Sequence, residues 1–145
     1  MTQYLTFKLG SELYGLDLLE IQEIRGYTPA TPLPNAPMHF KGVINLRGVI
    51  VPVVDLRSQF GLSPEQPNKL NVIVVVNVKG RITGLLVDAV ADVVEMNPAD
   101  IKAAPPVSGA MPPSFIRGMV KIGEQLLIVL EIDRVVNSGD AELAA

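Results

Sequence analysis

The chain has 145 residues, of which 48% are hydrophobic, and its formal net charge at pH 7 is −3. This length suits one compact domain or two very small ones. The 12 Lys and Arg residues are dispersed, so the basic surface that neutralises nucleic-acid phosphates is missing and we expect no nucleic-acid partner. The chain contains no cysteine, which excludes disulfides, thiolate nucleophiles and cysteine-based metal sites.

We do not expect direct membrane insertion or export. The longest uninterrupted apolar runs span about five or six residues, whereas a membrane helix needs roughly 20. The first residues, Met1 to Tyr4, lack the basic region and the long apolar segment of a signal peptide. The expected protein is therefore soluble and intracellular.

The first elements form a predicted hairpin. Tyr4 to Leu9 alternates between apolar and polar side chains, Gly10-Ser11 is a turn signal, and Glu12 to Asp17 returns as a second strand. Residues 18–25 are ambiguous between a strand and one helical turn. An extended, irregular loop follows, because proline removes a backbone donor and fixes φ. Its prolines are Pro29, Pro32, Pro34 and Pro37.

The stretch from Gly42 to Leu56 predicts a second hairpin. Two runs rich in Val and Ile, which favour strands, flank a polar break at Arg47-Gly48. Glycine adopts positive φ without steric cost, so this dipeptide suits a turn and should expose Arg47. Asp55 is a candidate N-cap for a short helix that Gly61 would end.

Two further hairpins and a short helix complete the expected elements. The strand from 70 to 78 has an apolar centre without polar alternation, so both of its faces should be buried. The others are, in order, the turn Lys79-Gly80, a return strand over 81–87 that continues through Val90, Val93 and Val94, a proline-rich connector over 97–113, strands over 115–122 and 125–130 around Gly123-Glu124, and a helical turn over 131–137. Many short strands with regular turn signals are typical of small barrels or a sandwich.

The two halves of the chain resemble each other, which indicates an internal repeat. At one constant spacing, the matching pairs are Tyr14-Gly15-Leu16 with Thr83-Gly84-Leu85, and Ile21 to Ile24 with Val90 to Val93. At a slightly longer spacing, the matching pairs are Gly42-Val43-Ile44 with Gly118-Met119-Val120, and Val53 to Leu56 with Val129 to Ile132. A strand pair, a connector, a hairpin and a helical turn therefore occur twice, which predicts two five-stranded barrels.

Each predicted barrel has about 70 residues, a size at which one core alone is marginal. The barrels should therefore share a buried interface, with exchange of the N-terminal strand or the C-terminal helix left open. We place a single domain over 1–145, with one subdomain over approximately 12–68 and the other over approximately 69–137. A groove between two packed barrels would suit a binding partner.

The sequence shows no obvious catalytic or metal-binding constellation. His39 is the only histidine, which argues against a zinc site in a chain without cysteine. Asp88, Asp92 and Glu95 lack the loop spacing of a calcium site and suit a solvated strand face. Ser108 lacks the Gly-x-Ser-x-Gly frame of an activated nucleophile. We expect no cofactor, no metal, no catalytic residue and no enzymatic activity.

Glu23 and Arg47 stand out because each is a charge embedded among apolar residues. They are either ordinary exposed charges or a pair at the rim of an apolar binding patch. Charges at such a rim fix register and specificity more than they add affinity. The residues alone leave both interpretations open.

Two stretches, Ile21 to Tyr27 and Gly42 to Leu56, closely resemble the CheW family of chemotaxis adaptors. The specific motif reads Asn45-Leu46-Arg47-Gly48, then Pro52-Val53 and Asp55-Leu56. The resemblance covers the chain from about Tyr4 to Asn137. The motif is shared with CheV and with the regulatory domain of the chemotaxis histidine kinase CheA. The chain is too short for the full kinase and leaves no room for the receiver domain of CheV.

The resemblance implies an all-β fold of two intertwined SH3-like barrels with short helical segments. It also implies a non-enzymatic scaffold that couples CheA to the cytoplasmic tips of methyl-accepting chemoreceptors, in the cytoplasm at membrane-associated arrays. The implied receptor-binding residues are Ile21, Glu23, Gly42 and Arg47. The implied kinase-binding residues, in the segment after Tyr27, are Ala30, Thr31 and Leu33. Glu23 and Arg47 should lie close together, and they could pair with each other, with the receptor, or with both.

Two alternatives stay open. A related interaction module, such as a CheV-like or kinase-derived fragment or a module of a non-motility kinase array, would bind at most one of CheA and a receptor. An enzyme acting on a small ligand in the groove would need a buried, strongly perturbed acid or base. The sequence offers no obvious candidate for such a group.

Overall fold

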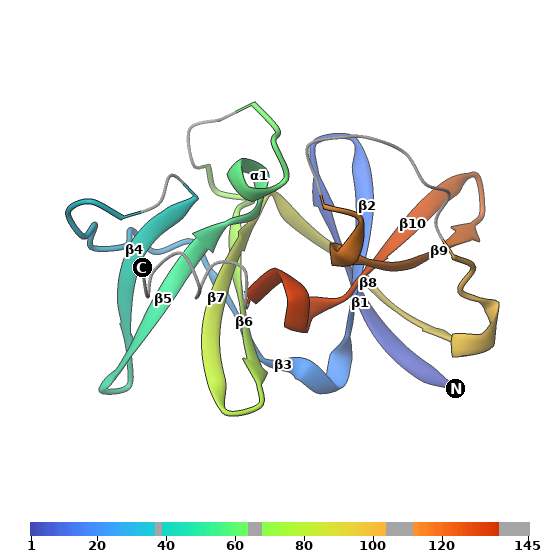
Figure 1. Cartoon of the computed structure of the whole chain (residues 1–145), viewed down its shortest axis with the longest axis horizontal. Helices are drawn as coiled ribbons and strands as arrows, with labels where there is room; N and C mark the ends of the chain where they lie inside the picture. Colours follow the sequence, from blue (N-terminus) through green and yellow to red (C-terminus); the bar gives the residue numbers. More distant parts are fainter. Residues whose placement is uncertain (37–38, 64–67, 104–111, 137–145) are drawn as a thin grey trace.

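The computed structural model describes residues 1–36, 39–63, 68–103 and 112–136, which form ten strands in two five-stranded sheets (Figure 1). The strands are β1 (Thr2–Leu9), β2 (Glu12–Asp17), β3 (Ile21–Gly26), β4 (Phe40–Leu46), β5 (Val49–Asp55), β6 (Val72–Val78), β7 (Arg81–Val87), β8 (Ala89–Met96), β9 (Ile116–Ile122) and β10 (Gln125–Leu130). The helical elements are the single 3-10 turns η1 (Leu18–Glu20), η2 (Pro98–Asp100) and η3 (Pro113–Phe115), the helix α1 (Leu56–Gln59), and a helical turn over 132–136. The prediction of an all-β fold with two five-stranded units is confirmed.

The two sheets draw on different parts of the chain. One has the strand order β3-β6-β7-β5-β4 and uses the middle of the sequence; we call it the central barrel. The other has the order β8-β1-β2-β10-β9 and joins the two ends of the chain; we call it the terminal barrel. They lie side by side along the long axis of the molecule (Figure 1).

The sheets do not follow the boundaries that we predicted. With subdomains over approximately 12–68 and 69–137, β6 and β7 should have joined β9 and β10, but they belong to the central barrel. Conversely, β2 belongs to the terminal barrel. The exchange therefore involves whole hairpins, rather than the N-terminal strand or the C-terminal helix alone.

Two parallel strand pairings cause this exchange. In the central barrel, Gly84 of β7 lies opposite Val53 of β5. In the terminal barrel, their repeat equivalents face each other in the same way, with Gly15 of β2 opposite Val129 of β10. Each half of the chain thus gives its first hairpin to the barrel that the other half completes.

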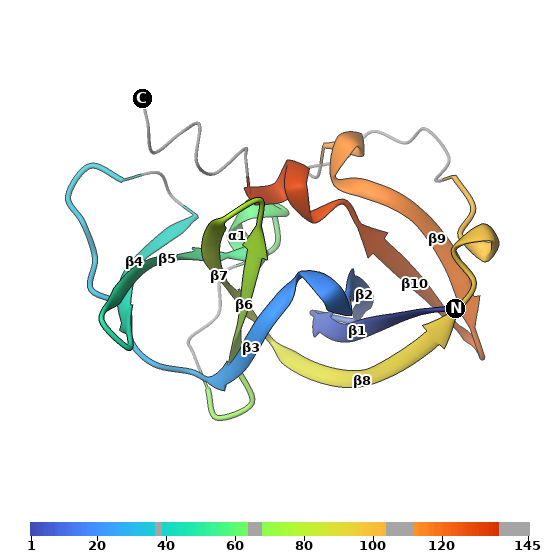
Figure 2. The same cartoon turned by 90° about the horizontal axis from the view of Figure 1, so that it is seen from below.

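The chain crosses between the barrels twice. It crosses first at η1, where residues 18–20 separate β2 from β3, and this resolves the predicted ambiguity over 18–25 into a 3-10 turn and a strand. It crosses again at Asp88, between β7 and β8. The prediction that the strand over 81–87 continues through Val94 is wrong, because β7 pairs with β6 whereas β8 pairs with β1. Figure 2 shows β3 beside β6 and β8 beside β1.

The predicted tight turns of the central barrel are confirmed. Arg47 and Gly48 have φ of 51° and 89°, and Lys79 and Gly80 have φ of 53° and 86°. Two consecutive positive φ angles are the signature of the two-residue turn whose twist matches that of the flanking strands. After the first of these hairpins, the side chain of Asp55 accepts a hydrogen bond from the Arg57 backbone at 3.0 Å and caps α1, as predicted.

The largest apolar cluster lies between the barrels, not inside either of them. It combines side chains of both sheets with α1 and the helical turn over 132–136. Its fully buried members include Phe7, Leu16, Val74, Leu85 and Ile132. Smaller clusters around Val51 and Leu127 fill the individual barrels. This arrangement explains how two units of marginal size form one stable body.

Strand β6 serves both cores. Val74 and Val76 point into the shared cluster, whereas Ile73 and Val75 point into the central barrel. All four are inaccessible to solvent. The prediction that this strand is buried on both faces is therefore confirmed.

Candidate functional site

Glu23 on β3 and Arg47 at the tip of the β4–β5 hairpin form an ion pair with each other. Arg47 Nη2 donates a short hydrogen bond to Glu23 Oε1. The Arg47 side chain is 69% exposed, whereas that of Glu23 is 24% exposed. Arg25 Nη1 lies 3.7 Å from the other carboxylate oxygen of Glu23. A partly buried carboxylate thus holds an exposed guanidinium in place.

The local backbone places these two side chains. The register of β3 against β6 shifts between Ile21 and Glu23, so Gln22 is the extra residue of a β-bulge. Bulges change the direction in which the following side chain points. At the other side, Arg47 adopts a positive φ, which is uncommon for a residue other than glycine, and Asn45 Oδ1 accepts a 2.7 Å bond from the Gly48 amide.

Exposed apolar side chains accompany the ion pair. Ile24 follows Glu23 and is 44% exposed, while Ile50 lies three residues after Arg47 and is 62% exposed. Ile21 is partly buried and packs against the shared cluster between the barrels. The sequence analysis missed Ile24 and Ile50, although their apolar character beside the two charges was a usable signal. Exposed apolar side chains thus occur on the same two elements as the ion pair, but Ile24 points to the opposite face of β3 from Glu23, because successive residues of a strand alternate between faces.

Gly42 is buried and has a structural reason to be glycine. Its φ is +138°, and a Cβ added there would lie 2.2 Å from the carbonyl oxygen of Thr31. The close approach is required because Thr31 and Val43 exchange two backbone hydrogen bonds, of 2.8 and 2.9 Å. Gly42 thus closes the barrel, and the structure does not present it on the surface with Glu23 and Arg47.

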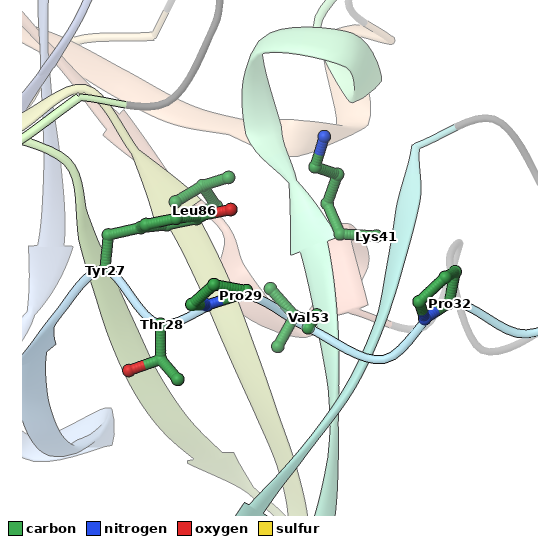
Figure 3. Close-up of a pocket in the computed structure, with 8 residues that line it drawn as sticks. Tyr27, Thr28, Pro29, Pro32, Lys41, Val53 and Leu86 are labelled. Atoms are coloured by element: carbon green, nitrogen blue, oxygen red, sulfur yellow. The ribbon is translucent and has the colours of Figure 1, made fainter.

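The segment after β3 forms one wall of a cavity of about 180 Å³ (Figure 3). Its lining residues are Tyr27, Thr28, Pro29, Ala30, Pro32, Lys41, Val53 and Leu86. Proline fixes φ, so the wall is stiff. Figure 3 shows the ring of Tyr27 beside Leu86, with Lys41 above Val53. The lining of the cavity is mixed, because the apolar side chains are accompanied by the polar residues Tyr27, Thr28 and Lys41.

Of the three predicted kinase-binding residues, Ala30 lines this cavity. Thr31 and Leu33 lie beside it on the exposed loop, where Leu33 is 48% exposed. The sequence analysis missed Lys41, Val53 and Leu86. Leu86 reaches the cavity only because β7 pairs with β5, and no local pattern in the sequence signals that pairing.

Perturbed ionisable groups lie outside the Glu23–Arg47 pair and the cavity. Burial raises the pKa of Tyr14, with a smaller effect of Glu12, and the ring of Tyr14 stacks on Phe7 in the shared cluster. Burial also raises the pKa of the Glu20 carboxyl in η1. Within the four described ranges, no group of three His, Cys, Asp or Glu side chains is arranged to hold a metal ion.

A family model for the CheW-like domain matches residues 3–140. The chain belongs to the CheW-like family. The chemotaxis protein CheW of Rhizobium meliloti is 38% identical over 142 residues, which cover 98% of this chain and 92% of that protein. That of Klebsiella aerogenes is 38% identical over 141 residues, with 97% and 85% coverage.

The structure agrees with this assignment. The crystal structure of the scaffolding protein TtCheW from Thermoanaerobacter tengcongensis superposes with a TM-score of 0.84 and 34% identity, over 90% of this chain and 84% of that chain. The predicted pair of intertwined SH3-like barrels and the predicted family are therefore confirmed. This CheW-family chain is a chemotaxis adaptor with a coupling role in signalling. Its described helices are all too short to span a membrane.

Proposed function

We propose that this adaptor couples the regulatory domain of the histidine kinase CheA to the cytoplasmic tips of methyl-accepting chemoreceptors. It does so in the cytoplasm at membrane-associated arrays, as a scaffold without catalytic activity. The observation that carries the proposal is the Arg47 guanidinium, which is exposed at the tip of the β4–β5 hairpin and is held there by Glu23. This is the arrangement expected of a specific protein-binding surface.

The receptor side uses Ile21, Glu23 and Arg47. A guanidinium has five N–H donors, and its bond to Glu23 leaves others directed to solvent. A helical receptor tip could offer a carboxylate or a free helix-terminal carbonyl to these donors. Its apolar side chains would cover Ile50, which is exposed on the same hairpin as Arg47. Gly42, the fourth residue of the proposed set, contributes by allowing the barrel to close rather than by direct contact.

The kinase side uses the loop after β3. Ala30 borders the cavity, and Thr31 and Leu33 extend the surface beside it. A cavity of about 180 Å³, lined partly by prolines and other apolar residues, suits a single side chain of a partner. Lys41 would favour an acidic residue next to that side chain. The receptor and kinase surfaces then lie on the same barrel but on different segments of it.

The receptor surface is tested by Arg47→Glu. We expect this variant to lose receptor-dependent activation of CheA in a mixture of receptor fragment, kinase and adaptor, because the reversed charge repels the partner group and Glu23 alike. Circular dichroism should show an intact fold, since a charge reversal at an exposed position rarely unfolds a domain. Lys121→Glu, on the exposed face of β9, is the control and should retain coupling. If the Arg47 variant is recruited to receptor arrays as well as the unmodified protein, the assignment of Arg47 to the receptor surface is wrong.

The kinase surface is tested by Ala30→Asp. A carboxylate at the mouth of an apolar cavity would be desolvated on docking, so we expect the affinity for the CheA regulatory domain to fall about tenfold. Receptor binding should stay within about twofold of the unmodified protein. Calorimetric titrations with each partner measure both effects. Equal kinase affinity in the two proteins would place the docking site elsewhere.

A further inference from the structure

Asp88, at the second crossing between the barrels, bonds to both of them. From the terminal barrel, the Gly10 amide donates to Asp88 Oδ2 at 2.7 Å, and the Lys8 carbonyl accepts from the Asp88 amide at 3.1 Å. From the central barrel, Arg57 Nη1 donates to the same Oδ2 at 2.5 Å, and Asn71 Nδ2 donates to the Asp88 carbonyl at 3.0 Å. The prediction that Asp88 belongs to a solvated strand face is therefore wrong, because its carboxylate is bonded within the protein between β7 and β8.

The ion pair in this network is partly buried and well supported. The side chains of Arg57 and Asp88 are 12% and 24% exposed. Arg57 Nε also donates to the Ser63 carbonyl at 3.0 Å, which fixes the plane of the guanidinium. Charge-assisted hydrogen bonds in such surroundings are stronger and more directional than those between neutral groups. The pair therefore ties α1 of the central barrel to the β1–β2 turn of the terminal barrel.

The internal repeat supplies a control for this interpretation. Ile21 on β3 lies opposite Val76, and its repeat equivalent Val90 on β8 lies opposite Phe7. Asp88 comes two residues before Val90, so its repeat equivalent is Leu19, two residues before Ile21. Leu19 is 91% exposed, and its side chain has no polar atom with which to form such a network.

In the repeat, Asp133 is the equivalent of Arg57, and the β6–β7 turn at Lys79 is the equivalent of the β1–β2 turn. These two residues form an ion pair at 3.5 Å, in which the Lys79 side chain is 81% exposed. Exposed pairs of this kind contribute little. Among the described ion pairs, the one equivalent to Arg57–Asp88 is therefore the more exposed and the weaker.

We propose that Asp88 and Arg57 clamp the two barrels at the β7–β8 crossing, and that Asp88 is a positioning residue for the receptor surface. The inference rests on the proposed function, because it assigns a role to the geometry of that surface. Ile21 follows the first crossing, at η1, and packs against the cluster that both barrels share. A shift of one barrel against the other therefore displaces Ile21. The cavity after β3 should be less affected by this shift, because its lining residues Tyr27, Ala30, Val53 and Leu86 pack in the separate apolar cluster of the central barrel rather than in the shared one.

The position of the barrels can be measured with paired spin labels, since the chain has no cysteine of its own. Ile50→Cys and Leu126→Cys place the labels at equivalent, exposed positions of the two barrels. We expect Asp88→Asn, and independently Arg57→Gln, to broaden the distribution of distances between the labels. Val129→Ala, which opens the separate core of the terminal barrel, is a destabilised control and should leave the distribution unchanged. A distribution in both clamp variants that matches the unmodified protein overturns the clamp.

Binding assays on the full chain then test the positioning role. We expect Asp88→Asn to weaken binding of a receptor-tip fragment about tenfold and to leave affinity for the CheA regulatory domain unchanged. The Asp88→Asn/Arg57→Gln double variant should lose no more than either single variant, because both changes remove one interaction. Equal losses in Asp88→Asn and Val129→Ala would overturn the positioning role in favour of stability alone. If the unmodified chain fails to bind the receptor fragment, the proposed function is wrong, and the spin-label distances still decide whether the clamp exists.

Discussion

The central and terminal barrels share a backbone plan but carry different side chains at two equivalent positions. The tip of the β4–β5 hairpin is Arg47-Gly48, whereas the tip of β9–β10 is Gly123-Glu124. The bulged strand of the central barrel carries Glu23, and that of the terminal barrel carries Asp92. Only in the central barrel can these two positions form an ion pair, because Gly123 has no side chain.

Asp92 finds its partners locally instead. Its backbone amide and carbonyl bond to the Thr6 hydroxyl at 2.9 and 3.0 Å, and its carboxylate accepts the Val93 amide at 2.8 Å. In the central barrel the equivalent of Thr6 is Val75, which offers no such group. In the terminal barrel the bulge residue Asp92 thus bonds within its own sheet, whereas in the central barrel the equivalent Glu23 holds an exposed arginine. Positions that the repeat preserves support the fold, and positions that it changes are the better candidates for function.

The largest expected effect concerns a position that the repeat preserves. Gly42→Ala and Gly118→Ala should each lower the free energy of unfolding by about 2–4 kcal/mol, because a Cβ would lie 2.2 Å from the Thr31 carbonyl oxygen or 2.5 Å from that of Lys102. Urea denaturation measures both values. Gly26→Ala is the control, since a Cβ there meets nothing within 4 Å. If Gly42→Ala is as stable as the unmodified protein but fails to bind receptor, Gly42 contributes to receptor binding directly.

The local features of the fold could be predicted from the sequence because each depends on a few adjacent residues. Arg47-Gly48 suits a tight turn wherever its strands lie, and Asp55 caps α1 through its own neighbours. The exchange of hairpins could not be predicted in the same way. The first hairpin of each half has the same apolar pattern whether it pairs within its own half or with the other. The choice depends on parallel pairings such as Gly84 with Val53, between residues far apart in the sequence.

The candidate site also has a part that the sequence predicts and a part that depends on the tertiary fold. Glu23 and Arg47 could be proposed from their unusual setting and from the family motif, and the structure brings them together. The cavity after β3 and the clamp at Asp88 could not be proposed, because Leu86 and Arg57 reach them from strands and helices that only the tertiary fold brings near. Gly42 was named as a receptor-binding residue only through the family resemblance, and the close approach of Thr31, which requires a glycine there, leaves no trace in the sequence.

A smaller effect is expected when the central bulge loses the charge of Glu23. Glu23→Gln removes the charge that holds Arg47, so the guanidinium should sample more orientations and receptor affinity should fall about threefold. Stability should change by well under 1 kcal/mol, because the Arg47 side chain is mostly exposed. Asp92→Asn in the terminal barrel is the matched control and should not change receptor affinity. Titrations at low and high salt add a check, because added salt should shrink the difference between Glu23→Gln and the unmodified protein.

The smallest expected effect separates the two crossings by their dependence on pH. Burial raises the pKa of Glu20 in η1 above its ordinary value of 4.5; Arg117 opposes this, and the nearby carboxylates of Asp17, Glu131 and Asp133 add to it. Its equivalent at the other crossing is Ala89, which does not titrate. Because the pKa of Glu20 is higher in the folded state than in the unfolded state, the folded protein is relatively stabilised while Glu20 is protonated, below pH 4.5. This stabilisation is lost as the pH rises through the folded-state pKa of Glu20. Glu20→Gln should therefore raise the melting temperature slightly at pH 7 and leave it unchanged near pH 4. An equal gain at both pH values would mean that the Glu20 charge does not weaken the η1 crossing.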